Sequence, residues 1–187
     1  MKKTSKNFGT LSSLSARDSQ WNSGFLAELF EKSSHTTRET LKMALWHKDN
    51  SATFENFKTA EKLKVERAKH GFEERYEFAG GTSDWVPRKG ETKAIHQGTS
   101  WSDGDCYKYM EGLCRIYSNI GSGSERDEIK LELDSLIKIV AGAQEEDGYL
   151  QTQITIPYRS RWITRLFHED YNLGHLFTAA SAHYIAT

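Results

Sequence analysis

The sequence predicts an all-α fold built from antiparallel helical hairpins. Between residues 102 and 144, apolar residues recur three or four positions apart in two runs, which places them on one face of each of two helices. The segment Gly121-Ser122-Gly123-Ser124 separates the runs and is typical of a helix end followed by a tight turn. A short turn between two helices favours an antiparallel pair, and the sequence lacks long strand patterns.

The first hundred residues predict less regular structure. Residues 1–20 are polar and read as a loose lead-in to a domain that covers residues 21–187. Helical spacing begins at Trp21, is interrupted by the Ser/Thr-rich segment 33–37, and resumes over residues 41–46. Residues 54–78 then suggest a short helix and loop, and residues 79–100 a long glycine-containing connection.

The hairpin and the C-terminal segment complete the predicted order. Asp103 and Asp105 fit the start of the first hairpin helix as capping residues, and the second helix runs from about 125 to 144. After a turn at 146–148, the β-branched residues of 149–158 predict an extended piece. A last helix is expected from near Leu166 to the final residue without a stop signal, which suggests that the sequence is cut within a larger domain.

Composition excludes several classes of function. The 187 residues carry 25 Lys and Arg against 26 Asp and Glu, so the net charge of -1 argues against a nucleic-acid or polybasic membrane surface. No apolar run approaches the roughly 18 residues of a membrane span, and no secretory signal is recognisable. We therefore expect a cytoplasmic protein, with secretion left open. Cys106 and Cys114 are interpreted as inert buried residues.

His168 and His175 form the strongest local pattern. They are seven positions apart, so on one helix they would share a face about 10 Å apart, which is too far for both to bind one metal ion. Such a pair, with Asn172 between, could line a groove for polyhydroxyl ligands; the alternative is a set of polar residues satisfied in a helix interface. Gly174 suggests close approach of a neighbouring element or a ligand.

Carboxylates and tryptophans supply further candidates. Glu145, Glu146 and Asp147 form a cluster that could serve acid–base chemistry, although a solvated helix end is the commoner explanation for such a cluster. Trp85, Trp101 and Trp162 are candidate stacking platforms for a sugar ring, or else core or lid residues. The sequence holds no phosphate-binding glycine loop and no nucleophile elbow.

Three segments taken together resemble the β-L-arabinofuranosidase family, glycoside hydrolase family 127. They are WSDGDCYKYME at 101–111, AGAQEEDGYLQT at 141–152 and HEDYNLGHLFTAASAHY at 168–184. The family carries similar blocks, SDVYKWLEA, AQxxDGYLNT and HELYxAGHLIEAAVAHY, in this order. Gly104, Cys106, Asp170, Asn172 and Leu173 depart from these blocks, which leaves the expected fold intact and the substrate open.

The resemblance implies part of an (α/α)6 barrel and a retaining glycosidase acting on arabinofuranosides. It implies a cysteine nucleophile held on zinc with other cysteines and a glutamate, and none of these matches a position in this chain. No catalytic residue and no cofactor are therefore expected here, although the full-length family enzyme would bind zinc. The candidate sugar-binding residues are His175, His168, Asp147, Tyr149 and Trp101.

Two classes of function remain open at this point. In the first, the chain is the N-terminal part of such a glycosidase, inactive alone, with a carbohydrate as its partner and neither nucleic acid nor membrane. In the second, it is a non-catalytic helical module that binds carbohydrate or serves as a scaffold.

Overall fold

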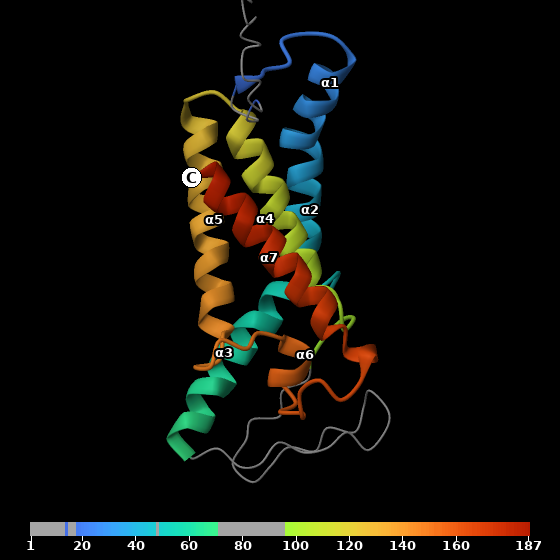
Figure 1. Ribbon diagram of the computed structural model, residues 1–187, viewed down its shortest axis with the longest axis vertical. Coiled ribbons are helices and arrows are strands. Elements are labelled where there is room, and N and C mark those ends of the chain that lie inside the picture. Colours follow the sequence, from blue (N-terminus) through green and yellow to red (C-terminus); the bar gives the residue numbers. More distant parts are fainter. Residues whose placement is uncertain (1–13, 15–17, 48, 71–95) are drawn as a thin grey trace, which may run out of the picture.

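The computed structural model describes residue 14 and residues 18–47, 49–70 and 96–187. Helices make up the fold in this part of the chain, and none of its residues forms a β-strand, so the predicted all-α class is confirmed. The helices α1–α2, α4 and α5 lie side by side, and α7 crosses in front of them in Figure 1. No helix in the described part combines the length and apolar character that a membrane crossing requires.

The first helical rod is continuous where the sequence predicts a break. It consists of α1 (Phe25–Lys32), the π-helical turn η2 (Ser33–Thr37) and α2 (Arg38–Trp46), with helical backbone angles at both junctions. The buried Ser34 hydroxyl donates to the carbonyl oxygen of Phe30 at 2.9 Å, one turn back. The segment 33–37 is therefore a π-helical turn within one rod and not the predicted break, and the Ser34 side chain bonds to the helix in which it lies.

Helix α3 (Thr53–His70) is longer than the short helix predicted from residue 54. Its buried side chains Phe54, Phe57, Ala60 and Leu63 recur at helical spacing and face the core, while most of its charged side chains, with the exception of the buried Arg67, lie outside. The rest of the predicted 54–78 segment, and most of the 79–100 connection with Trp85, lie outside the described residues.

The predicted hairpin is present as α4 (Ser102–Asn119) and α5 (Ser124–Ala143), which run in opposite directions (Figure 1). Gly123, with φ of 150° and ψ of 180°, lies in the connection immediately before α5. Large buried side chains of this hairpin and of α3 form most of the core: Phe54, Phe57, Leu63, Tyr107, Leu113, Ile129, Leu133 and Leu136.

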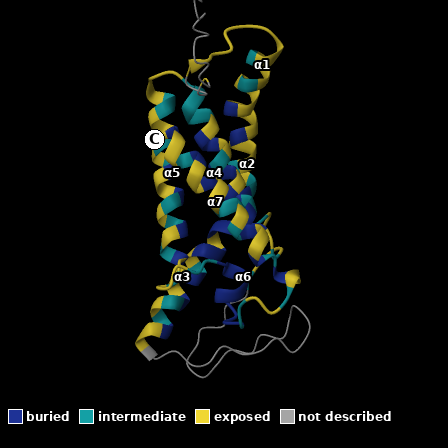
Figure 2. Ribbon diagram, in the orientation of Figure 1, coloured by how far each residue is buried: buried dark blue, intermediate teal, exposed yellow. Residues whose placement is uncertain are grey.

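The segment from 149 to 158 is not extended. It holds α6 (Thr152–Thr155), and every residue from 151 to 159 is buried, as the dark blue around α6 in Figure 2 shows. The β-branched residues Ile154, Thr155 and Ile156 suggested a strand, but contacts with other segments determine the local backbone here.

Helix α7 (Glu169–Ala186) begins three residues later than predicted, after the short 3₁₀ turn η3 (Arg165–Phe167). It packs along α4, and its fully buried hydrophobic side chains are all small, namely Ala179, Ala182 and Ala186. Because these side chains are small, the two helices can approach closely.

Candidate functional site

The candidate site lies at the end of the bundle where α4 and α7 both begin. This is the lower end in Figure 1, where α6 and the connections on either side of it also lie. The first turns of the two helices carry acidic residues, Asp103 and Asp105 in α4 and Glu169 and Asp170 in α7. Negative charge is favourable at a helix N-terminus, which is a physical reason for acids to gather at this end.

Four rings form a row along the junction of α4 and α7. The ring centroids of Trp101 and His168 are 5.1 Å apart, those of His168 and Tyr171 6.0 Å, and those of Tyr171 and His175 4.6 Å. Neighbouring rings meet at steep angles of 67° to 84°, an edge-to-face arrangement that aromatic pairs favour. Trp101 is 42% exposed and Tyr171 41%, so part of this ring row is open to a ligand.

His168 does not occupy the helical position that the sequence predicts. It precedes α7 with φ of 55° and ψ of 30°, so its backbone is left-handed, and the expectation that it shares a helical face with His175 is wrong. Tyr171 lies between the two histidines and connects them. The His168 Nδ1 atom lies 2.9 Å from the carbonyl oxygen of Leu166 and 3.0 Å from the Ser100 hydroxyl.

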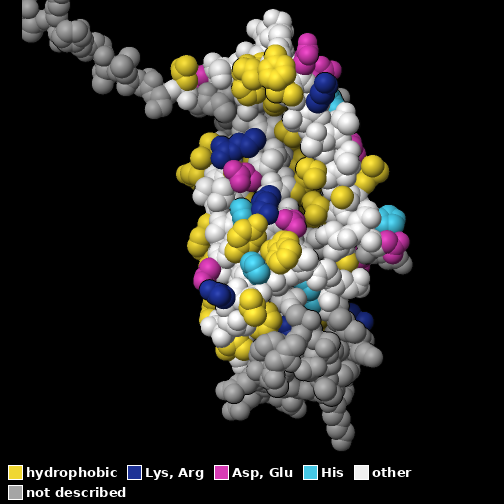
Figure 3. Space-filling model, turned by 90° about the vertical axis from the view of Figure 1, so that its right-hand side faces the viewer, with side chains coloured by type: hydrophobic (Ala, Val, Ile, Leu, Met, Phe, Trp, Pro, Cys, Tyr) yellow, Lys and Arg dark blue, Asp and Glu magenta, His cyan; other side chains and the backbone are white. Residues whose placement is uncertain are grey.

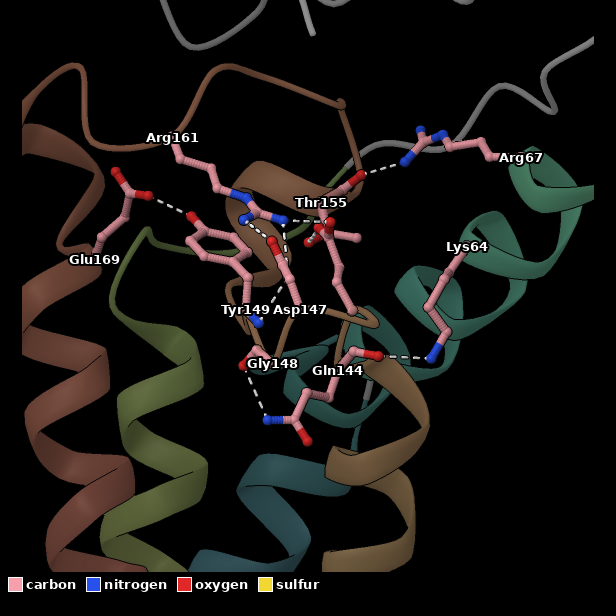
Figure 4. A network of polar contacts seen from close by, with 10 residues as sticks. Lys64, Arg67, Gln144, Asp147, Gly148, Tyr149, Thr155, Arg161 and Glu169 are labelled. Atoms are coloured by element: carbon pink, nitrogen blue, oxygen red, sulfur yellow. Dashed lines mark hydrogen bonds and ion pairs between the residues drawn. The ribbon is translucent and has the colours of Figure 1, made fainter. Parts of the chain in front are cut away.

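Asp147 and Tyr149 belong to a second group of polar side chains, drawn in Figure 4. The Arg161 guanidinium binds both carboxylates of the turn, at 2.7 Å from Glu145 and 3.2 Å from Asp147, and lies 3.9 Å from the centre of the Tyr149 ring. Burial alone would lower the pKa of Arg161, but its hydrogen bonds to Asp147 and Glu145 raise it above its ordinary value. Ion pairing therefore explains this cluster better than a solvated helix end does.

Glu169 connects the two groups. Its carboxylate accepts hydrogen bonds from the Tyr149 hydroxyl and, at 2.8 Å, from the Trp162 backbone N–H. Glu169 follows His168 in the chain. Its bond to Tyr149 therefore connects the turn that contains Asp147 and Tyr149 with the ring row. Trp162, a predicted platform, is 54% exposed and packs edge-on against Tyr149 at 5.7 Å.

Asp103 is a buried acceptor rather than a helix cap. Its carboxylate accepts the backbone N–H of Thr152 at 2.7 Å and the Thr152 hydroxyl at 2.6 Å, and it thereby fixes the start of α6 to α4. Burial raises the pKa of Asp103 to about 6. Asp105 pairs with Lys108 at 2.9 Å, and neither aspartate caps α4, so the prediction of two capping residues is wrong.

The close helix approach occurs at Gly104 and not at Gly174. A β-carbon at position 174 would meet nothing within 4 Å, so no neighbouring element of the described part approaches that glycine, and the approach of a ligand there stays a prediction. At position 104 it would lie 2.7 Å from the Asn172 Oδ1 atom and 3.1 Å from the Tyr171 ring. In the sequence, Gly104 stands out only as a departure from the family blocks.

One buried amide and one acid at this site are not identifiable from the sequence, because Gln151 and Glu169 carry no local signal that distinguishes them from other polar residues. Asn172, for which the sequence leaves open a groove or a helix interface, is fully buried and hydrogen-bonded between the segments. Hydrogen bonds of these three residues reach across 16 to 72 positions in the sequence, so only the folded chain reveals them.

The two cysteines are core residues, as the sequence predicts. Both are buried, and burial raises the pKa of Cys106 well above its ordinary value and that of Cys114 to about 11. Such thiols are poor nucleophiles and poor metal ligands because the thiolate is the reactive form. Within the described part of the chain, no group of three or more His, Cys, Asp or Glu side chains is arranged to hold a metal ion, so these residues do not fit a zinc centre.

Two solved structures resemble this chain. A GH127 β-L-arabinofuranosidase from Geobacillus stearothermophilus T6 is 25% identical with a TM-score of 0.64, and the match covers 88% of this chain and 22% of that one. A second GH127 β-arabinofuranosidase is 29% identical with a TM-score of 0.56, covering 84% of this chain and 22% of the other. This chain thus spans about a fifth of the length of each, and its helices correspond to part of their helical barrel.

No match was found among curated proteins. Residues 20–187 match the family described as β-L-arabinofuranosidase, GH127 catalytic domain, which is nearly the whole chain. The family resemblance of the three sequence segments is therefore confirmed, and the chain belongs to the GH127 β-L-arabinofuranosidase catalytic-domain family.

Proposed function

We propose that this chain is the N-terminal part of the catalytic domain of a retaining glycosidase that cleaves β-L-arabinofuranosides. The observation that carries the proposal is the family match over residues 20–187. The two structural neighbours, both arabinofuranosidases by description, support the choice of sugar.

We assign carbohydrate binding to the end of the bundle where α4 and α7 begin. Trp101 and Tyr171 are partly exposed aromatic side chains of the kind against which the C–H groups of a sugar ring pack. His168 and His175 add ring nitrogens that can donate or accept hydrogen bonds with hydroxyl groups. The Asp147 side chain is 57% exposed, so its carboxylate can accept further bonds at the rim, and Tyr149 holds Arg161 and Glu169 in place beside it.

Exposed apolar surfaces support the view that further helices complete the domain. The outward side of α7 carries Phe177, Tyr184 and Ile185, which are 61%, 87% and 63% exposed. A groove of about 710 Å³ between the α1–α2 rod and α4 has a mainly apolar surface. Figure 3, which views the molecule from the right-hand side of Figure 1, shows hydrophobic side chains at several places on that face. Surfaces of this extent are normally covered by another part of a protein.

The nucleophile and the zinc ion that the family implies are assigned to the remainder of such a catalytic domain. The described residues of this chain provide no zinc site, and the buried Cys106 and Cys114 are unsuited to either role. The task of this chain is then to bind and orient the sugar, and to exclude water from one side of it.

Assaying the purified 187-residue chain with p-nitrophenyl β-L-arabinofuranoside tests whether the nucleophile lies outside this chain. We expect no release of nitrophenol above the rate without protein, because the nucleophile is missing. Turnover by this chain alone would contradict the assignment of the nucleophile to another segment. A longer polypeptide that continues into the remainder of the domain should be active, and its activity should fall about tenfold or more in His175→Ala.

A further inference from the structure

Two buried amide side chains join three segments at the start of α4 and α7. Asn172 is 0% exposed and Gln151 1%. The Asn172 Nδ2 atom donates to the Ser100 carbonyl oxygen at 2.9 Å and to the Gln151 Oε1 atom at 2.8 Å, while its Oδ1 atom accepts the Gly104 N–H at 2.9 Å. Gln151 Nε2 then donates to the Phe167 carbonyl oxygen at 2.7 Å.

The two amides hold the peptide groups that precede Trp101 and His168. The Ser100 carbonyl belongs to the peptide bond leading into Trp101, and the Phe167 carbonyl belongs to the one leading into His168. A direct contact also joins these segments, because the Ser100 hydroxyl donates to the Leu166 carbonyl oxygen at 3.0 Å. The positions of two members of the ring row therefore depend on Asn172 and Gln151.

The backbone of His168 makes this support necessary. Its φ of 55° and ψ of 30° are unfavourable for a residue with a β-carbon, and they place the ring against Trp101 on one side and Tyr171 on the other. Strained residues of this kind persist where the surroundings determine their conformation, and they concentrate at functional sites.

Gly104 is part of the same arrangement. Its N–H reaches Asn172 because no β-carbon stands between the two helices, and a β-carbon there would come within 2.7 Å of the Asn172 Oδ1 atom. Gly112, in the same helix, offers a direct comparison because a β-carbon at that position would meet nothing within 4 Å.

We propose that Asn172 and Gln151 are positioning residues for carbohydrate binding: they hold Trp101 and His168 so that the ring row is formed before the sugar arrives. This inference rests on the proposed function of that row. Preorganisation of this kind raises affinity because less freedom is lost on binding. A purely structural role would instead predict that these amides affect stability and leave the row unchanged.

Four variants of the 187-residue chain separate the two roles. Gly104→Ala pushes Asn172 away and also crowds the Tyr171 ring, Gly112→Ala is the matched control, and Asn172→Ala removes the amide without touching Tyr171. The double variant Gly104→Ala/Asn172→Ala relieves the clash with Asn172 alone and does not restore the amide. The measurements are the melting temperature, the NMR signals of the Trp101 indole and the His168 ring, and the affinity for p-nitrophenyl β-L-arabinofuranoside. Gln151→Glu, which keeps the shape and loses the donor to Phe167, replaces Gly104→Ala if that variant does not fold.

The proposal predicts that both ring signals move and that affinity falls about tenfold or more in Gly104→Ala and Asn172→Ala, with no change in Gly112→Ala. The double variant should recover melting temperature relative to Gly104→Ala and still bind weakly. Recovery of affinity together with melting temperature, or unmoved ring signals in Asn172→Ala, would overturn it. If the wild-type chain binds no arabinofuranoside, the proposed function of the row fails, whereas the ring signals still decide whether the amides position it.

Discussion

At the scale of single residues, two buried titratable groups near the start of α4 act in opposite directions over the same pH range. Burial raises the pKa of Asp103 to about 6 from an ordinary value of 3.8, so the folded state favours the protonated carboxyl group. The contribution of Asp103 to stability is fully present below pH 3.8 and is lost as pH rises through 6. Burial and the Arg159 charge lower the pKa of His96 to about 4 from 6.5, so its contribution is present above pH 6.5 and is lost as pH falls through 4.

Asp103→Asn should therefore make the free energy of unfolding rise more steeply between pH 4 and 6 than in the wild type. The variant removes the contribution of Asp103 to the pH dependence and keeps that of His96. Between pH 4 and 6 its free energy of unfolding should therefore rise by about 2–3 kcal/mol more than that of the wild type, at roughly 1.4 kcal/mol per pKa unit. Urea unfolding at several pH values measures it. An Asp103→Asn curve that runs parallel to the wild type would contradict this expectation.

At the scale of elements, Arg67 of α3 fixes the segment that contains α6. The Arg67 side chain is 6% exposed, donates to the Thr155 carbonyl and, at 2.8 Å, to the Ile156 carbonyl, and lies 4.5 Å from the Tyr158 ring centre. These contacts hold the buried 151–159 segment against α3, where its β-branched residues alone would favour an extended backbone.

Arg67→Met should lower the free energy of unfolding by about 2–4 kcal/mol, because the stem still packs but two buried carbonyl groups lose a charged donor. Lys62→Met is the control in the same helix, since the Lys62 side chain is 65% exposed and its ion pair with Glu66 is a surface pair worth less than about 1 kcal/mol. Chemical denaturation of the two variants compares them. Equal losses would mean that the Arg67 contacts contribute little.

The helical hairpin of residues 102–144 is predictable because periodic apolar residues and a glycine turn are local signals. The elements that escaped prediction depend on distant contacts. Thr152 starts α6 by bonding to Asp103, 49 positions away, and Ser34 lies in a helix although its neighbours suggest a break. Propensity alone gives the wrong answer where tertiary contacts decide.

In the candidate site, too, some residues are predictable from local signals and others depend on distant contacts. His168, His175 and Trp101 are identifiable because their residue types and the family blocks attract attention, and the structure brings them into one row through Tyr171. Asp147 and Tyr149 lie instead in the Arg161 cluster, connected to the row by Glu169. The amides of Gln151 and Asn172 escape prediction because their role depends on which carbonyl groups the fold places beside them.

At the scale of the whole molecule, the outward side of α7 decides how the isolated chain behaves. We expect the 187-residue chain to bind the dye ANS and to self-associate, since Phe177, Tyr184 and Ile185 lie exposed on one helix. Replacing all three by Ser should reduce both effects and leave the melting temperature nearly unchanged, because these side chains contribute little to the core.

Ala179→Leu provides the contrast on the buried side of α7. Ala179 is 3% exposed in the core, so a larger side chain there should lower stability by about 1–3 kcal/mol. Light scattering and thermal unfolding distinguish the two faces. A triple Ser variant that melts as early as Ala179→Leu would show that the outward side is part of the packed structure.

The central claim is that the ring row at the start of α4 and α7 binds an arabinofuranoside, and its most direct test is a titration of the isotopically labelled chain with p-nitrophenyl β-L-arabinofuranoside followed by NMR. The account predicts that the signals of Trp101, His168 and His175 shift together and saturate, that His175→Ala abolishes the effect, and that His183, two turns further along α7, stays unchanged. The absence of saturable shifts at these rings, or shifts confined to other parts of the chain, would contradict it.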